Sequence, residues 1–271
     1  MFGVLLDYGQ NLDVVNLFES DFYKNYCARL YDYNQKGYIS ADASTDTTAV
    51  GELVKAGTLM SYTTGGKPGI KAQETTLTGR DMTIFQTLDD YISSTSVAGM
   101  PWTIPISAQH KEAAMKFLNE CYTNADVANL LAWGIEGTHY KIGDDGLATY
   151  ADGVAASNSG WNHSMGWMMP NQFLTHVWEG NDPDLWTKMK EFNTNAKVSK
   201  ASGFSFDSTN VANELTAVQN VYNEYQTSVE YGFVDPETGI AEMNDKMMTA
   251  GLQKIIDEKK AQLAAWQEAN K

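Results

Sequence analysis

Apolar side chains recur every three or four residues along much of this chain, the spacing that builds one buried face of a helix. The pattern predicts helices over residues 19–33, 44–56, 107–121, 125–133 and 171–179, another that opens at Asp182, a long one over 211–229 and a last one over 243–269. Asn124 is placed to cap the helix over 125–133, and Gly134 to end it. Gly251 falls inside the last helix, where a glycine costs about 1 kcal/mol relative to alanine.

Shorter apolar runs predict strands over residues 2–6, 58–64, 82–92 and 104–106. Pro105 confines the last of these to a sheet edge or to the end of a strand. The polar turn 143–146 separates residues 140–142 from 147–150, which predicts a hairpin. The chain is therefore expected to be rich in helices, with few and short strands.

Composition narrows the class of protein. The chain has 271 residues and a formal net charge of −15, which argues against a nucleic-acid partner and against a polybasic membrane-surface role. Cys27 and Cys121 each lie on the apolar side of a predicted helix, which favours two buried thiols over a disulfide bridge. The sequence has no apolar run long enough to span a membrane and no secretory signal at its start. It is thus either cytoplasmic or does not begin at the N-terminus of its natural protein.

The sequence lacks several common catalytic motifs. It has no H-E-x-x-H zinc pair, no G-x-S-x-G nucleophile elbow and no G-x-G-x-x-G dinucleotide turn. A phosphate-binding P-loop that includes Lys67 is also excluded, because Ser61 stands where the motif needs a glycine. We therefore predict no catalytic residue, no metal site and no cofactor. The acid best placed for catalysis is Glu136, between two glycines and close to His139; it is either one of a pair of hydrolase carboxylates or a structural group that accepts backbone N–H bonds in its own turn.

Aromatic residues suggest a different chemistry. The 7 Trp and 14 Tyr either fill the core or stack on the flat faces of sugar rings. A cluster over residues 161–171 holds two Trp, and its functional interpretation requires Trp167 to face a cleft with Asn171 and Gln172 reaching sugar hydroxyls. Tyr62 and Thr63, before a glycine-rich turn, and His139 and Tyr140, after a predicted helix end, are candidates of the same kind.

Several of these segments, in this order, resemble one protein family. The segments starting at Trp102 (Trp-Thr-Ile-Pro), Glu112 (Glu-Ala-Ala-Met-Lys-Phe-Leu-Asn) and Trp133 (Trp-Gly-Ile-Glu-Gly-Thr-His-Tyr) are similar to extracellular solute-binding proteins of family 1, the capture components of ABC importers. The branch in question carries an uncharacterised C-terminal domain, which residues 199–207 and the closing helix resemble. The sequence departs from that pattern at Ser202, where a larger apolar residue is expected before Gly203.

The resemblance implies a fold, a function and a location. The fold would be α/β, a partial periplasmic-binding-protein-like type II fold, helix-rich with a small mixed sheet. Residues 1–106 would form part of one α/β lobe with hinge strands, and residues 107–271 a returning helical segment of the other lobe and a C-terminal helical region. The chain would correspond to about the C-terminal half of a monomeric cell-surface lipoprotein. Since half of the cleft would be missing, we expect solute affinity to be weak or absent in this chain.

The implied function is capture, without chemical change, of a carbohydrate or oligosaccharide for ABC permease transmembrane subunits. The candidate solute-binding residues are Tyr62, Thr63, Trp102, Glu136, His139, Tyr140, Trp167, Asn171 and Gln172. Two alternatives stay open: a peptide-binding ABC receptor, and a carbohydrate-active hydrolase that uses Glu136.

Overall fold

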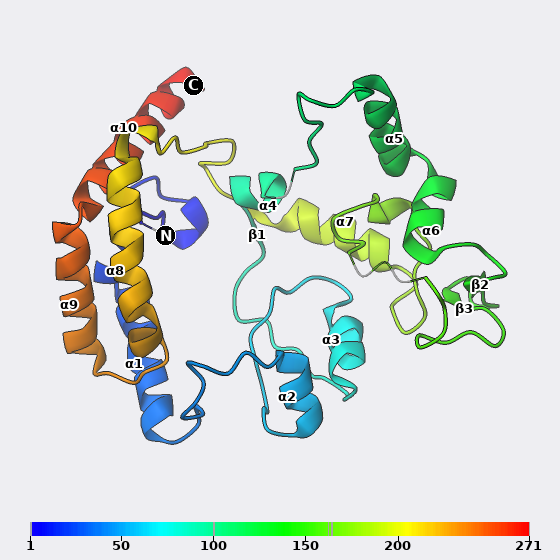
Figure 1. Ribbon diagram of the computed structural model, residues 1–271, viewed down its shortest axis with the longest axis horizontal. Coiled ribbons are helices and arrows are strands. Elements are labelled where there is room, and N and C mark those ends of the chain that lie inside the picture. Colours follow the sequence, from blue (N-terminus) through cyan, green and yellow to red (C-terminus); the bar gives the residue numbers. More distant parts are fainter. Residues whose placement is uncertain (1, 100, 162, 164, 271) are drawn as a thin grey trace. The chain divides into compact units, whose positions relative to one another are not determined.

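A computed structural model describes residues 2–99, 101–161, 163 and 165–270 of the chain (Figure 1). The chain divides into two compact units, and neither is continuous in sequence. Unit 1 comprises residues 1–48, 91–97 and 197–271, and unit 2 comprises residues 49–90 and 98–196. The boundary expected between residues 106 and 107 lies inside unit 2, so the assignment of 1–106 and 107–271 to lobes of a larger protein stays a prediction.

Unit 1 is built mainly from helices. Its long helices are α1 (Asp21–Gln35), α8 (Ala212–Glu230), α9 (Pro236–Thr249) and α10 (Leu252–Ala269), and its short elements are η1 (Asp7–Gly9), η2 (Leu17–Glu19), β1 (Tyr91–Ile92), α4 (Ser94–Ala98, whose last residue falls in unit 2), β4 (Lys197–Val198) and η4 (Thr209–Val211). Helix α8 packs against α1, α9 and α10, and these four helices lie side by side in Figure 1. Their inner faces enclose the main core, whose fully buried members include Phe18, Cys27, Val218, Val229, Met243, Met247, Leu252 and Ile255.

The C-terminal helix predicted over 243–269 is two helices. Gly251 has a backbone φ of 111°, and a Cβ there would lie 2.6 Å from the Cγ atom of Glu214. The glycine therefore ends α9 and allows α10 to start in a new direction, rather than weakening one continuous helix. Helix α9 begins well before residue 243: the Asp235 side chain accepts a hydrogen bond from Thr238 N at 3.1 Å, and Pro236 occupies the first turn.

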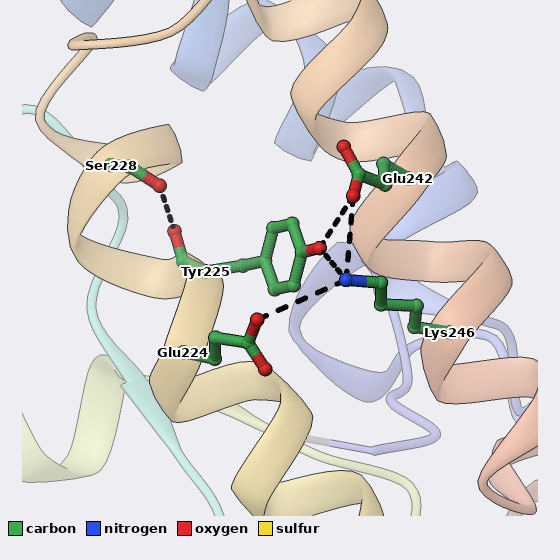
Figure 2. Close-up of polar contacts among 5 residues, drawn as sticks. All are labelled: Glu224, Tyr225, Ser228, Glu242 and Lys246. Carbon is green, nitrogen blue, oxygen red and sulfur yellow. Dashed lines mark hydrogen bonds and ion pairs between the residues drawn. The ribbon is translucent and has the colours of Figure 1, made fainter.

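Polar side chains also join α8 to α9 (Figure 2). The hydroxyl of Tyr225 donates to Glu242 at 2.6 Å, and the Lys246 ammonium lies between that hydroxyl, Glu242 and Glu224. Hydrogen bonding from Tyr225 and Lys246 lowers the pKa of the Glu242 carboxyl, and the Tyr225 hydroxyl raises the pKa of Lys246. Because the group is exposed, it aligns the two helices and contributes little to stability.

Unit 2 holds shorter elements. These are α2 (Val50–Ala56), α3 (Ile70–Thr78), α5 (Lys111–Thr123), α6 (Ala125–Trp133), β2 (Tyr140–Ile142), β3 (Ala148–Tyr150), η3 (Gln172–Leu174) and α7 (Leu185–Asn195). A small core of Leu147, Val177 and Leu185, with Trp186 against it, lies within this unit.

The elements of unit 2 that the sequence predicts best are bounded by local capping or turn residues. The Asn124 side chain accepts hydrogen bonds from Asp126 N at 3.0 Å and from Val127 N at 3.4 Å, so it caps α6, and Gly134 follows the end of the helix with φ 84°. The hairpin is also confirmed, since β2 and β3 pair antiparallel with Tyr140 opposite Tyr150.

Other boundaries differ from the prediction. Helix α5 begins at Lys111 instead of residue 107, α2 covers only the second half of 44–56, and α7 begins three residues after Asp182. Only the short η3 forms within 171–179. Helix α3 was not predicted at all.

The predicted strands are mostly wrong. Residues 58–64 and 104–106 have no strand structure, and of 82–92 only Tyr91–Ile92 form β1. Within 2–6 a single bridge joins Val4 to Val15. The strands that do form make two separate pairs, the parallel pair β1–β4 and the antiparallel pair β2–β3. In place of one small mixed sheet, the described residues form two separate two-stranded sheets, one in each unit.

Two further sequence observations concern cysteine and the membrane. Cys27 and Cys121 are free thiols, both buried, as predicted. Within the described residues, none of the helices is long and apolar enough to cross a membrane.

Candidate functional site

All of the predicted solute-binding residues lie in unit 2, where the structure places them in separate groups. The first group surrounds the backbone carbonyl of Met168. The indole Nε1 of Trp102 and the hydroxyl of Tyr122 both donate to this oxygen, each at 3.3 Å. Trp102 is 47% exposed and Tyr122 43%, and Trp167, next to Met168 in sequence, is 53% exposed. Three aromatic side chains therefore remain open to solvent while two of them are fixed by hydrogen bonds.

Asn171 fixes this group to the end of α5. Its backbone N–H donates to the Cys121 carbonyl at 3.1 Å, and its side-chain Nδ2 donates to the Tyr122 carbonyl at 3.2 Å. Its Oδ1 atom accepts from Phe173 N at 3.2 Å and so caps η3. The Asn171 amide therefore holds this segment against the backbone at the end of α5. Gln172 is half-buried and approaches Gly166, where its Nε2 atom would lie 3.1 Å from an added Cβ.

The second group follows α6. The His139 Nδ1 atom accepts a hydrogen bond from Ile135 N at 2.8 Å, and its ring packs on Gly134 and lies 6.4 Å from the Trp161 ring. Tyr140 is only 4% exposed, and burial, then nearby Glu136, raises the pKa of its hydroxyl. Glu136 itself is exposed. Of this group, Glu136 is the side chain most open to a solute, whereas His139 and Tyr140 mainly hold the turn together.

The third group joins the segment before α3 to α3 itself. The Tyr62 hydroxyl donates to a carboxylate oxygen of Glu74, which is 3% exposed and also accepts from Gln73 Nε2 at 3.1 Å. This hydrogen bond to a carboxylate raises the pKa of Tyr62 to about 12, since it favours the protonated phenol. Thr63 beside it is exposed. Tyr62 is thus held in one orientation by a buried acid.

Sequence reasoning missed Tyr122 and Glu74. Tyr122 lies outside the apolar face of its helix, and an exposed aromatic residue at that position was an available signal. Glu74 could not be found, because α3 was not recognised and nothing in the sequence shows that a carboxylate of this helix turns inward.

Three other aromatic residues of unit 2, Trp133, Tyr150 and Trp178, are structural. The rings of Trp133 and Trp178 lie 4.7 Å apart, and Tyr150 meets Trp178 edge-on at 4.9 Å. The Trp133 indole donates to the His176 carbonyl at 3.2 Å. These rings pack α6 against the hairpin and leave the group around Met168 as the exposed aromatic surface on which the functional interpretation depends.

The described part of the chain offers no group of three or more His, Cys, Asp or Glu side chains that could hold a metal ion. A groove of 680 Å³ lies in unit 1, between α1 and α9, and a shallower one lies on α5. The predicted residues line neither of them.

Comparisons with known proteins connect these features to a family. Residues 200–268 match the family described as "Domain of unknown function (DUF3502)". Over 261 residues the chain is 28% identical to a carbohydrate ABC transporter substrate-binding protein of Streptococcus pneumoniae serotype 4. The matched region covers 94% of this chain and 52% of that protein. The chain thus spans about half the length of the curated relative it matches.

Solved structures agree in fold. The crystal structure of the N-glycan transport solute binding protein (NgtS) from Streptococcus pneumoniae superimposes on all of this chain with a TM-score of 0.87, at 23% identity and over 60% of its own length. The same protein in complex with Man5GlcNAc gives a TM-score of 0.77 over 98% of this chain, at 24% identity and over 58% of its own length. The predicted resemblance and the predicted fold class are both confirmed: this chain has the fold of a large part of an ABC-transporter solute-binding protein, and its C-terminal helices match the DUF3502 family.

Proposed function

We propose that this chain is part of the substrate-binding component of a carbohydrate ABC importer. It binds an oligosaccharide without breaking a bond and presents it to permease subunits on the outer side of the membrane, where a lipid anchor on the natural protein holds it as a monomer. The observation that carries the proposal is the similarity along 94% of the chain to a carbohydrate ABC transporter substrate-binding protein. NgtS structures with Man1GlcNAc and Man5GlcNAc add support for the sugar class.

The exposed aromatic group supplies a suitable surface. A flat indole or phenol ring covers the C–H face of a pyranose, and a fixed ring loses little conformational entropy on binding. Trp102 and Tyr122 are fixed in this way by Met168, and Trp167 extends the surface. Polar groups must then meet the sugar hydroxyls. Glu136, Thr63 and Gln172 are exposed or half-buried and fill that role in the proposal.

The remaining predicted residues take supporting roles. Asn171 holds its own segment against the end of α5, while His139 and Tyr140 shape the turn that carries Glu136. The O–H group of Tyr62 donates its hydrogen bond to Glu74, so Tyr62 offers a solute its ring face and a free lone pair of its oxygen.

Saturation-transfer NMR on this chain tests the proposal, because the method detects weak binding. Man1GlcNAc and Man5GlcNAc should both receive magnetisation from the protein, most strongly at ring C–H protons. Trp102→Ala and Trp167→Ala should each weaken binding by about five- to ten-fold, the value of one aromatic contact. Trp266→Phe, in unit 1, is the matched control and should change nothing.

Each other outcome contradicts either the proposed function or the proposed site. Transfer to tri-alanine but not to the glycans would support a peptide receptor. Cleavage of the glycan, abolished in Glu136→Gln, would support a hydrolase. Transfer to the glycans that both tryptophan substitutions leave unchanged would leave sugar capture standing and refute the site.

A further inference from the structure

The groove of unit 1 lies between α1 and α9, outside the proposed solute site. Its floor is apolar: Ala28 and Ala241 are exposed in it, while Phe18 is fully buried and Ile240 is only 5% exposed, so these two lie below its surface. Ala28 and Ala241 line it with small side chains, which leaves a volume of 680 Å³ open. Half of its lining comes from α9, within the region that matches the DUF3502 family.

The groove is elongated. Its lining residues on this side run from Asp235, the N-cap of α9, to Asn244, which corresponds to about 15 Å along a helix axis. That length fits four to five residues of an extended chain, at about 3.3 Å each. A small cationic ligand with a single amine would occupy only a small part of the groove.

The charged groups around the groove are mainly acidic. Glu19, Asp235 and Glu237 contribute three carboxylates, and Lys24 contributes the one ammonium among the lining residues. Asn244 holds Glu19 in place by donating to its Oε1 atom at 3.2 Å. An apolar floor with acidic edges is complementary to lysine or arginine, whose aliphatic stem covers apolar surface while its charged head reaches a carboxylate.

We propose that this groove is a docking site for a short basic segment of a partner protein. The segment lies extended along α9, its lysine or arginine stems rest on Ala28 and Ala241, and its cationic heads pair with Glu19 and Glu237. This gives the C-terminal domain a recognition role that is separate from solute capture, so it stands whether or not the chain binds sugar.

Amide NMR shifts of the full chain test the docking site. The probe is the pentapeptide acetyl-Ala-Arg-Leu-Lys-Ala-amide, and its control replaces both basic residues with glutamine. The basic peptide should shift the amides of Asn25, Ala28, Glu237 and Ala241, with saturation. The neutral peptide should bind at least about five-fold more weakly, as expected for losing exposed ion pairs.

Substitutions separate charge from shape. The double variant Glu19→Gln, Glu237→Gln should bind the basic peptide about five-fold more weakly. The control double variant Glu224→Gln, Asp257→Asn makes the same charge change on α8 and α10, and its affinity for the peptide should stay within about two-fold of the unchanged chain. Ala241→Leu should fill the groove and prevent binding of either peptide. Equal affinity for both peptides, equal effects of the two double variants, shifts outside the groove, or no shift at all would each overturn the proposal.

Discussion

Gly232 provides a sharp test of how α1 is joined to the C-terminal helices. The residue is buried between α8 and α9 with a backbone φ of 67°. A Cβ there would lie 2.5 Å from the carbonyl oxygen of Leu30 and 2.6 Å from the Cα atom of Tyr31. Both are backbone atoms of α1, which cannot rotate away as a side chain can. We expect Gly232→Ala to force α1 away from the connection between α8 and α9.

The cost has two parts. A left-handed φ costs an L-residue about 1–2 kcal/mol, and overpacking against a rigid neighbour adds about 1–3 kcal/mol. Gly232→Ala should therefore destabilise unit 1 by about 2–5 kcal/mol. Gly37 is the matched control: its φ is 73°, yet an added Cβ would meet nothing within 4 Å. Gly37→Ala should cost only the first part, about 1–2 kcal/mol.

Native-state hydrogen exchange is the suitable assay, because two units need not unfold together and a single melting curve would mix them. The protection of core amides in α8, such as those of Val218 and Tyr222, reports the stability of unit 1. Protection should fall more in Gly232→Ala than in Gly37→Ala. If the two variants lose the same protection, the close approach of α1 to Gly232 plays no part in stability and the reasoning is refuted.

Three further predictions follow from single contacts. Asp235→Ala removes the acceptor for Thr238 N and should cost about 1 kcal/mol, read as lost exchange protection in the first turn of α9. Glu74→Gln should return the pKa of Tyr62 from about 12 towards 10.0, measured by ultraviolet titration. Because folding raises this pKa, the contribution of Tyr62 to stability is complete below pH 10 and declines as the pH rises towards about 12; a flat profile there would contradict the hydrogen bond. Gly251→Ala should destabilise unit 1, although helix propensity alone predicts a gain, and increased exchange protection of the α8 core amides would show that the helix break is not required.

The candidate site was only partly accessible from sequence. Exposed aromatics near Trp167 could be suggested from composition, but their order depends on the Met168 carbonyl, which accepts from both Trp102 and Tyr122. Trp102 is 66 positions from Met168 in sequence, and Tyr122 is 46 positions from it. Hydrogen bonds over such separations are a property of the folded chain. In the same way, Tyr140 follows a helix end as expected, yet burial places its ring below the surface.

The predicted strands failed for a related reason. Residues 58–64 and 82–90 have suitable composition, but a strand is stable only where another backbone pairs with it. Of residues 58–64 and 82–92, only Tyr91 and Ile92 find such a partner, in Lys197 and Val198, far along the chain. Helix α3 was missed because its ends are marked by Gly69 and Gly79 and it has little apolar periodicity between them.

The sequence by itself determined the elements whose stabilising contacts are local. Helices α1 and α6 and the hairpin β2–β3 follow from hydrophobic period, from the cap at Asn124, and from a glycine-containing turn, since each of these acts within a few residues. The tertiary structure alone decided the break at Gly251, where Glu214 approaches, and the orientation of Tyr62 by buried Glu74. These features depend on atoms brought together from separate parts of the chain, and no local pattern encodes that proximity.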